Sequence, residues 1–271
     1  MKFRPWGWVV AWLAATAAAF AAEQISFAAV PSVALGRALP IAIVAPAGPV
    51  LAADAPVLFF LHGRGRHHRS LVDSPAARAA LLNATCYVVL PQGEDGWYID
   101  SPEKPADRYN AYLEEVIAWA GQHLPISATP ARRGIAGWSM GGYGAVRFAQ
   151  THPGSFGFVA SVIGLLDFPR AENLPEGQNY RVPVPRFTAD PARWAELNPR
   201  HAVEALRGAR LTLVLASTGF ERTMNEHFLT ELERKRMPVQ VHRLEGGHEF
   251  SLVERAVPLV LADAAAYFSK P

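Results

Sequence analysis

The sequence predicts an α/β fold with a mostly parallel central sheet flanked by helices. Short apolar runs alternate along the chain with longer stretches that have the spacing of amphipathic helices. The apolar runs lack strict polar–apolar alternation, which favours strands buried on both faces, as in a parallel sheet. Half of the residues are hydrophobic and 18% are charged, a globular composition that excludes a disordered or collagen-like chain.

Six apolar runs are candidates for the parallel strands, and helices are expected between them. Two earlier segments, Ile25–Val33 and Leu39–Val44, are expected to add antiparallel edge strands. The clearest helical stripe runs over Tyr109–Ala120. The expected parallel strands are Val57–Leu61, Cys86–Leu90, Gly134–Trp138, Phe158–Ile163, Leu211–Ala216 and Val239–Leu244; the other expected helices are Met140–Gln150, Pro191–Leu206, Met224–Arg236 and Leu252–Phe268.

The segment Asp167–Asp190 is rich in Pro, Asn and Arg, so we expect it to form an irregular excursion over the sheet. The sequence contains no internal repeat, no low-complexity tract and no second-domain boundary, so residues 22–271 are expected to form one domain. The single cysteine, Cys86, opens an apolar run and is expected to pack in the core; it cannot form an intrachain disulfide.

Residues 1–21 have the pattern of a signal peptide. Lys2 and Arg4 precede an uncharged apolar stretch shorter than the roughly 20 residues of a membrane-spanning helix, and Ala19-Phe20-Ala21 offers a cleavage site. An uncleaved membrane anchor is the alternative. Cleavage would remove two of the 26 basic residues and none of the 24 acidic ones, leaving no net charge and no basic excess for nucleic acid. We therefore expect a secreted or periplasmic protein, without nucleic-acid partners and without stable membrane insertion after cleavage.

The strongest functional signal surrounds Ser139, which lies between an expected strand and an expected helix. Such a turn needs small residues two positions before and two positions after the serine, and Gly137 and Gly141 supply them. The turn lifts the hydroxyl out of the sheet and aims the N–H of Met140 at a developing oxyanion. Ser139 is therefore the candidate nucleophile and Met140 a candidate oxyanion donor. A plain glycine-rich turn is the alternative.

A serine hydroxyl needs a neighbouring base to take its proton. Among the nine histidines, His248 stands after an expected strand and before the last helix, and Gly246 and Gly247 would let its loop turn toward the serine. His248 is therefore the candidate base.

An acid is expected to orient this histidine, and it should follow the strand Leu211–Ala216. Glu221 is the only carboxylate there before the next helix, which makes it the first candidate. A negative charge favoured by the helix N-terminus is the alternative explanation for Glu221. Asp167 and Asp190 remain rival acids.

The loop after the strand Val57–Leu61 is the expected source of the second oxyanion donor. It begins His62-Gly63, and the backbone N–H of Arg64 is the candidate. His62 is expected to fix this loop through a hydrogen bond, at the border of the substrate pocket. The cluster Arg66, His67, His68 and Arg69 follows and forms either the mouth of the site or a solvated loop. Two adjacent histidines without a third ligand give little support for a metal, so neither a metal nor a cofactor is expected.

Aromatic residues are the remaining pocket candidates. Trp97 and Tyr98 follow the strand Cys86–Leu90, and the carboxyl ends of parallel strands face the ligand side of α/β sheets. Trp138, next to the serine, is assigned to the same pocket. For Trp97 and Tyr98, simple packing in the core is the alternative.

With these residues in view, the sequence resembles the esterase D-like "putative esterase" family of the α/β-hydrolase fold. That family includes S-formylglutathione hydrolases, feruloyl and acetyl-xylan esterases, enterobactin esterases and mycolyltransferases. The resemblance covers almost all of residues 22–271. Its motifs are Leu61-His62-Gly63, Val89-Leu90-Pro91 with Gly96-Trp97-Tyr98, Gly137-Trp138-Ser139-Met140-Gly141-Gly142, Asn198-Pro199 and Gly246-Gly247-His248-Glu249-Phe250.

The resemblance implies a cofactor-free serine hydrolase that acts on esters or thioesters, with oxyanion donation from Arg64 and Met140. One departure concerns the acid: many members carry Gly-x-x-Asp in the acid loop, whereas this chain reads Gly219-Phe220-Glu221. The expected function is an exported serine carboxylesterase for small-molecule or polysaccharide-linked esters. An acyltransferase that passes the acyl group to an alcohol or sugar, and a non-catalytic binding module, are the alternatives.

Overall fold

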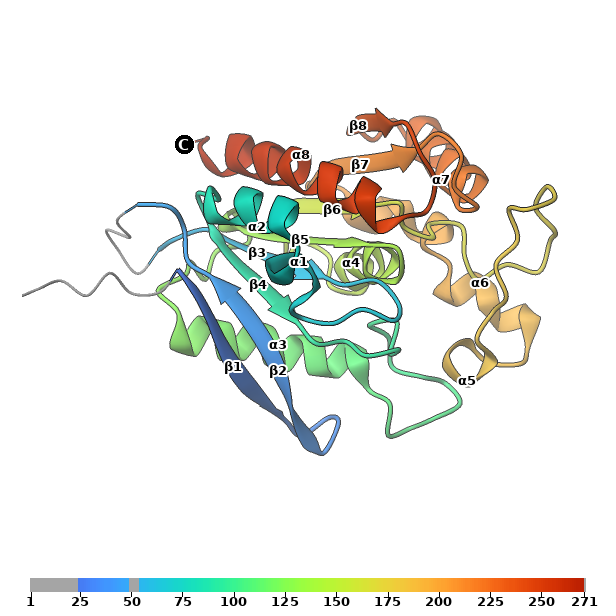
Figure 1. Cartoon of the computed structure of the whole chain (residues 1–271). Coiled ribbons are helices and arrows are strands. Elements are labelled where there is room, and N and C mark those ends of the chain that lie inside the picture. The colour runs from blue at the N-terminus through green and yellow to red at the C-terminus, as the bar shows by residue number, and fades with distance from the viewer. Residues whose placement is uncertain (1–23, 49–53, 271) are drawn as a thin grey trace, which may run out of the picture.

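A computed structural model describes residues 24–48 and 54–270, so the expected signal peptide lies outside the described residues. An eight-stranded sheet runs through the molecule in the order β1-β2-β4-β3-β5-β6-β7-β8 (Figure 1). The last six strands in this order are parallel, while β1 and β2 pair antiparallel with each other and β2 pairs antiparallel with β4. The mostly parallel sheet with two antiparallel edge strands is therefore confirmed.

The strands lie within a few residues of the expected ranges, and β3, β4 and β6 are buried along their whole length. All five residues of β3 are buried, and its side chains alternate between two separate hydrophobic clusters, one on each side of the sheet. The strand bounds are β1 Ile25–Ser32, β2 Arg37–Val44, β3 Val57–Leu61, β4 Tyr87–Pro91, β5 Arg133–Trp138, β6 Phe158–Val162, β7 Arg210–Ala216 and β8 Val239–Leu244.

Helices cover both faces of the sheet. One face carries α1 (Ser70–Asp73), α2 (Pro75–Leu82) and α8 (Phe250–Phe268), which stand in front of the sheet in Figure 1. The other face carries α3 (Tyr109–His123), α4 (Met140–Thr151) and α7 (Arg222–Arg234). None of the described helices is both long enough and apolar enough to span a bilayer.

The expected helix Pro191–Leu206 is wrong as a single element. The structure has a 3₁₀ turn (Pro191–Arg193), the short helix α6 (Trp194–Leu197) and a 3₁₀ stretch (Pro199–Leu206) instead. Asn198 is extended, as residues before a proline usually are, and its side chain accepts a hydrogen bond of 3.0 Å from the N–H of Arg200. The helix therefore stops and restarts at Asn198.

The segment expected to be irregular contains only one helix, α5 (Val184–Phe187), and projects with α6 beyond the carboxyl ends of the strands (Figure 1). Cys86 lies just before β4 and is 2% exposed, as a core residue. Burial raises the pKa of its thiol to about 12, so it is an unreactive packing group.

Candidate active site

Ser139 stands at the tip of a sharp turn between β5 and α4. Its φ of +54° and ψ of −121° lie in a region that side chains rarely adopt, and the turn places the serine at the N-terminus of the helix. The two flanking glycines are required by close backbone approaches. A Cβ on Gly137 would lie 2.2 Å from the carbonyl oxygen of Gly141, and one on Gly141 would lie 2.3 Å from that of Leu61. The turn expected from the sequence is present.

Three side chains from different loops form one hydrogen-bonded chain. His248, after β8, has its Nε2 atom 2.8 Å from the Ser139 Oγ atom. Its Nδ1 atom lies 2.8 Å from the Oε2 atom of Glu221, which precedes α7. With the carboxylate ionised, Nδ1–H donates a hydrogen bond to Glu221, and Nε2 accepts a hydrogen bond from the Ser139 hydroxyl. This is the arrangement that nucleophilic catalysis by serine needs.

Glu221 is completely buried, with 0% exposure. A Cβ on Gly219 would lie 2.2 Å from its Oε1 atom, so the glycine makes room for the carboxylate beneath the loop. Among the residues that the structure describes, Oε1 has no hydrogen-bond partner. The negative charge of Glu221 is therefore directed mainly at His248.

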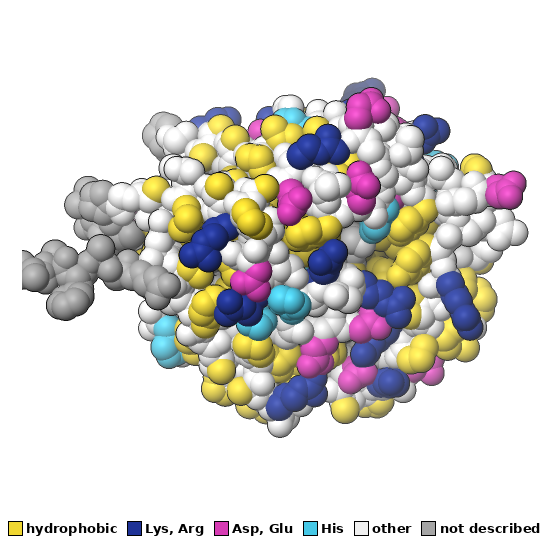
Figure 2. All heavy atoms as spheres, viewed as in Figure 1, with side chains coloured by type: hydrophobic (Ala, Val, Ile, Leu, Met, Phe, Trp, Pro, Cys, Tyr) yellow, Lys and Arg dark blue, Asp and Glu magenta, His cyan; other side chains and the backbone are white. Residues whose placement is uncertain are grey.

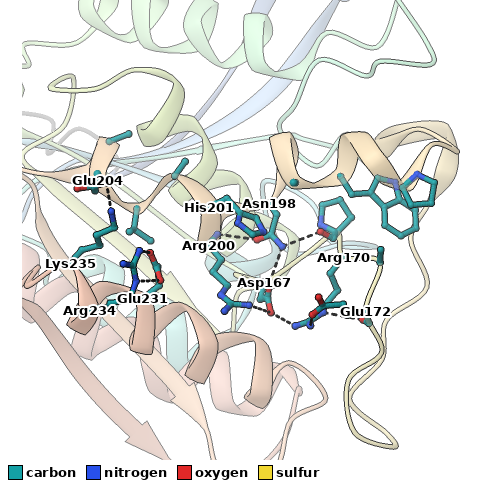
Figure 3. Close-up of a pocket in the computed structure, with 18 residues that line it drawn as sticks. Asp167, Arg170, Glu172, Asn198, Arg200, His201, Glu204, Glu231, Arg234 and Lys235 are labelled. Atoms are coloured by element: carbon teal, nitrogen blue, oxygen red, sulfur yellow. Dashed lines mark hydrogen bonds and ion pairs between the residues drawn. The ribbon is translucent and has the colours of Figure 1, made fainter.

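The two rival acids lie elsewhere. Asp167 forms its own cluster, shown in Figure 3, with ion pairs to Arg170 and Arg200 and a hydrogen bond of 2.9 Å from Asn198. Asp190 accepts a hydrogen bond of 3.0 Å from the N–H of Ala192 and caps the 3₁₀ turn. Neither carboxylate reaches the candidate base.

The charge state of Asp167 follows from its partners. Burial on its own would raise the pKa of this carboxyl, but hydrogen bonds from His227 and Asn198 and the charges of Arg170 and Arg200 hold it below its ordinary value. Asp167 thus ties the excursion after β6 to α7 and to the 3₁₀ stretch.

The loop expected to donate to an oxyanion lies against the nucleophile. A Cβ on Gly63 would be 3.3 Å from the Cβ of Ser139 and 2.7 Å from Nε1 of Trp138, so only glycine fits there. The N–H of Met140 belongs to the first turn of α4, where the helix itself offers no acceptor. Both expected donors, Arg64 and Met140, are thus in the neighbourhood of Ser139.

His62 is a packed loop residue that makes hydrogen bonds within its loop and to a second one, and its place at the border of the substrate pocket stays a prediction. It is 2% exposed, its Nε2 atom accepts a hydrogen bond of 2.8 Å from the N–H of Gly93, and its Nδ1–H faces the Gly63 carbonyl at 2.9 Å. Burial lowers the pKa of His62 to about 4, which keeps the ring neutral. His62 therefore holds two loops together.

The aromatic pocket candidates are also buried, and all three pack in the hydrophobic core. Trp97, Tyr98 and Trp138 are 1%, 0% and 4% exposed. The loop after β4 folds inward: the Tyr98 hydroxyl accepts a hydrogen bond of 3.0 Å from the N–H of His62, and its ring fills the space over Gly144 of α4. Contact of these three residues with the substrate stays a prediction.

Two aromatic residues that the sequence did not single out stand beside the candidate base. The Phe220 ring lies 4.3 Å from the His248 ring, and Tyr180 stacks on Phe220 with centroids 5.2 Å apart. The Tyr180 hydroxyl accepts a hydrogen bond of 3.1 Å from Arg64. Phe220 could have been found from its position next to Glu221. Tyr180 comes from the irregular segment and follows no motif.

The residues of the cluster 66–69 contact side chains of neighbouring elements. Arg66 lies over the Phe250 ring at 4.4 Å, Arg69 pairs with Asp73 at 3.1 Å, and the His68 N–H donates to Gln92. Across residues 24–48 and 54–270, no group of three or more His, Cys, Asp or Glu side chains could hold a metal ion. The cluster therefore connects its loop to α8, to the loop after β4 and to α1.

Comparison with known proteins shows which family the chain belongs to. The model of the family described as "Putative esterase" matches residues 32–251. The chain belongs to this family. A curated esterase of Mycobacterium tuberculosis is 25% identical over 226 residues, which cover 72% of this chain and 49% of that protein. The acetyl esterase of Caldicellulosiruptor saccharolyticus is 25% identical over 119 residues, 44% of this chain and 45% of its own. The chain thus spans about half the length of these curated relatives.

Solved structures show that this member of the esterase family has the α/β-hydrolase fold. FphF, a fluorophosphonate-binding serine hydrolase of Staphylococcus aureus, superposes with a TM-score of 0.77 at 18% identity, over 89% of this chain and 97% of FphF. An S-formylglutathione hydrolase from Agrobacterium tumefaciens has a TM-score of 0.75 at 19% identity, over 90% and 95% of the two chains.

Three hollows have lining residues near the carboxyl ends of the strands, and the smallest of them, about 460 Å³, lies at the ends of β7 and β8. A cavity of about 700 Å³ lies between α7 and the 3₁₀ stretch and contains Asp167, Arg170 and Arg200 but no member of the Ser–His–Glu chain (Figure 3). A groove of about 620 Å³ is lined by Arg64 and Tyr180, each of which is near the candidate site. None of the three hollows is lined by Ser139, His248 or Glu221. Two wall residues of the groove nevertheless adjoin the site, Arg64 next to Gly63 and Tyr180 against Phe220.

Proposed function

We propose that this protein is an exported serine carboxylesterase that cleaves ester bonds through an acyl-enzyme. The observation that carries this proposal is the Ser139–His248–Glu221 chain, with two contacts of 2.8 Å, at a strained turn on a helix N-terminus. Membership of the "Putative esterase" family and relatives that are named as esterases support the same reaction.

Each step then has a group to perform it. The Ser139 Oγ atom attacks the ester carbonyl carbon while its proton passes to Nε2 of His248. The carbonyl oxygen becomes an oxyanion, which the N–H groups of Met140 and Arg64 stabilise. Collapse of this intermediate breaks the bond to the alcohol, which leaves with the proton from His248.

Water completes the cycle. It attacks the acyl-enzyme and gives its proton to His248, the acid product leaves, and Ser139 is restored. Glu221 stays ionised throughout, holds the ring tautomer and stabilises the imidazolium. The same acyl-enzyme could pass its acyl group to an alcohol or sugar, and product analysis with excess acceptor separates the two reactions.

Export is proposed from the sequence of residues 1–21, with Lys2 and Arg4 before the apolar stretch and a small-x-small site at Ala19-Phe20-Ala21. The proposed location is the periplasm or the extracellular space.

The decisive experiment combines turnover with labelling. Wild-type protein should hydrolyse 4-nitrophenyl acetate and should be labelled at Ser139 by a fluorophosphonate probe. Ser139→Ala should keep its circular dichroism spectrum and lose nearly all turnover and labelling. An active, folded alanine variant, or labelling at another serine, would refute the assignment.

A further inference from the structure

The groove next to the candidate site has a basic lining. It is about 620 Å³ in volume and is formed by the loop after β3, the loop before α3 and the segment that ends in α5. Four basic side chains and one carboxylate line it: Arg64, Lys104, Arg181, Arg186 and Asp95. The whole chain, by contrast, carries a formal net charge of only +2. The positive charge in the groove is therefore concentrated locally.

Two wall residues, Arg64 and Tyr180, connect this groove to the candidate site. Arg64 follows Gly63, whose backbone lies against Ser139. Tyr180, on the opposite wall, stacks on Phe220, which contacts the ring of His248. In Figure 2, hydrophobic side chains in this region lie beside basic and acidic ones, between the centre of the face and the projection that carries α5 and α6. The groove therefore adjoins the candidate site on the side of Arg64 and Tyr180.

The carboxylates nearby neutralise only part of this charge. Asp95 is engaged by Arg64, at 2.9 and 3.1 Å, and Asp107 outside the lining is paired with Arg186. Lys104 and Arg181 are exposed and, within the described ranges 24–48 and 54–270, make no ion pair with a carboxylate. Two cations thus remain available at the rim of the groove.

We propose that the groove binds an anionic group of the substrate, so that the enzyme prefers esters bearing a carboxylate at a distance from the scissile carbonyl. This inference rests on the proposed function. Lys104 and Arg181 attract the anion through the local positive potential, while Arg64 and Arg186 are already held in place by Asp95 and Asp107. The carboxylate can belong to the alcohol part or to the acyl part of the ester.

Two pairs of esters separate these sources. For the alcohol part, 4-acetoxybenzoate is compared with its neutral methyl ester. For the acyl part, the mono-4-nitrophenyl ester of adipic acid is compared with 4-nitrophenyl hexanoate. In each pair, kcat/KM for the anionic ester is divided by kcat/KM for the neutral one, at low salt and again at high salt. We expect the wild-type ratio to exceed one in at least one pair and to fall as salt screens the groove.

The variant Lys104→Gln/Arg181→Gln should lower that ratio about 3- to 10-fold at low salt, since two charges near solvent are removed. The matched control, Arg210→Gln/Arg236→Gln, also removes two exposed charges, but at the start of β7 and just before β8, at the amino ends of these strands. Its ratio should equal that of the wild type.

The outcomes are distinguishable. A wild type that hydrolyses the neutral esters but never prefers the anionic ones, or an unchanged ratio in the groove variant, would overturn this inference and leave the esterase function standing. A wild type that hydrolyses none of the four esters would refute the proposed function, and this inference with it.

Discussion

The role of Glu221 is the point at which the family pattern and this chain differ, and Glu221→Gln tests it. The substitution keeps the size and a hydrogen-bonding end but removes the buried charge that faces Nδ1 of His248 at 2.8 Å. The ground state should therefore fold and bind substrate nearly normally. The loss should fall on the transition state, when the imidazolium carries a positive charge.

The magnitude follows from the geometry. Two unit charges about 4 Å apart interact by about 4 kcal/mol at an effective dielectric constant of about 20. Since about 1.4 kcal/mol corresponds to a factor of ten in rate, kcat should fall by roughly 10³. Loss of control over the ring tautomer adds to this loss, and incomplete burial of the imidazolium reduces it, so about 10²–10⁴ is the expected range. Glu221→Asp should be milder because the charge is retained.

The assay compares kcat on one activated acetate ester for Glu221→Gln, Asp167→Asn and Asp190→Asn, with circular dichroism as the check on folding. The two aspartate variants should stay within a few-fold of wild type, because neither carboxylate contacts His248. A folded Glu221→Gln enzyme within threefold of wild type would remove Glu221 from the catalytic machinery.

Four further outcomes are expected. Gly141→Ala should lower the unfolding free energy by about 1–3 kcal/mol in urea, because its Cβ would lie 2.3 Å from the backbone oxygen of Leu61; a wild-type midpoint would contradict this. 4-Nitrophenyl acetate should be hydrolysed faster than the laurate ester, since the polar segment Asp167–Asp190 offers little apolar shelter; the reverse order would refute this. Mass spectrometry of the exported protein should find an N-terminus at or near Ala22, whereas an intact Met1 on the exported protein would contradict cleavage. His62 has a pKa of about 4 in the folded protein and about 6.5 in the unfolded chain, so its contribution to stability is complete above pH 6.5 and is lost as the pH falls toward 4. Thermal melts should show a melting temperature that falls over this range, and His62→Gln should make the melting temperature less dependent on pH there.

The fold could be predicted largely from short-range patterns. Runs such as Val57–Leu61 are apolar on every residue because helices cover both faces of the sheet, and that burial is visible in composition alone. The one large error, a single helix over Pro191–Leu206, arose because the apolar spacing continues across Asn198 although Pro199 interrupts the hydrogen bonding. At that position, the proline predicted the end of the helix better than the apolar spacing did.

The candidate catalytic residues could be proposed from the sequence for a similar reason. Ser139 sits in a turn whose glycines are fixed by backbone contacts, and His248 and Glu221 each follow a strand at the same edge of the sheet. Because parallel strands bring their carboxyl ends together, the order of strands and loops is enough to propose that these three side chains meet.

The burial of Trp97 and Tyr98 could not be predicted, because the direction of a loop is a tertiary property. Trp97 and Tyr98 both have positive φ, +54° and +56°, and a Cβ on Gly96 would lie 2.2 Å from the Tyr109 ring. This tight path turns both aromatic rings into the core. Position after a strand was a sound guide to the right edge of the sheet, but it carried no information on whether the loop would fold inward or outward.

The walls of the site come instead from a segment with no motif at all. Tyr180 stacks on Phe220 and accepts a hydrogen bond from Arg64. The start of the same segment is held where Asp167 contacts Arg170 and Asn198. Chemistry and selectivity are thus specified by different kinds of sequence in this chain. The reacting groups follow short motifs at strand ends, whereas the shape and charge beside them depend on long-range contacts of an irregular excursion. Members that share the serine and histidine motifs can therefore differ in substrate without any change in those motifs.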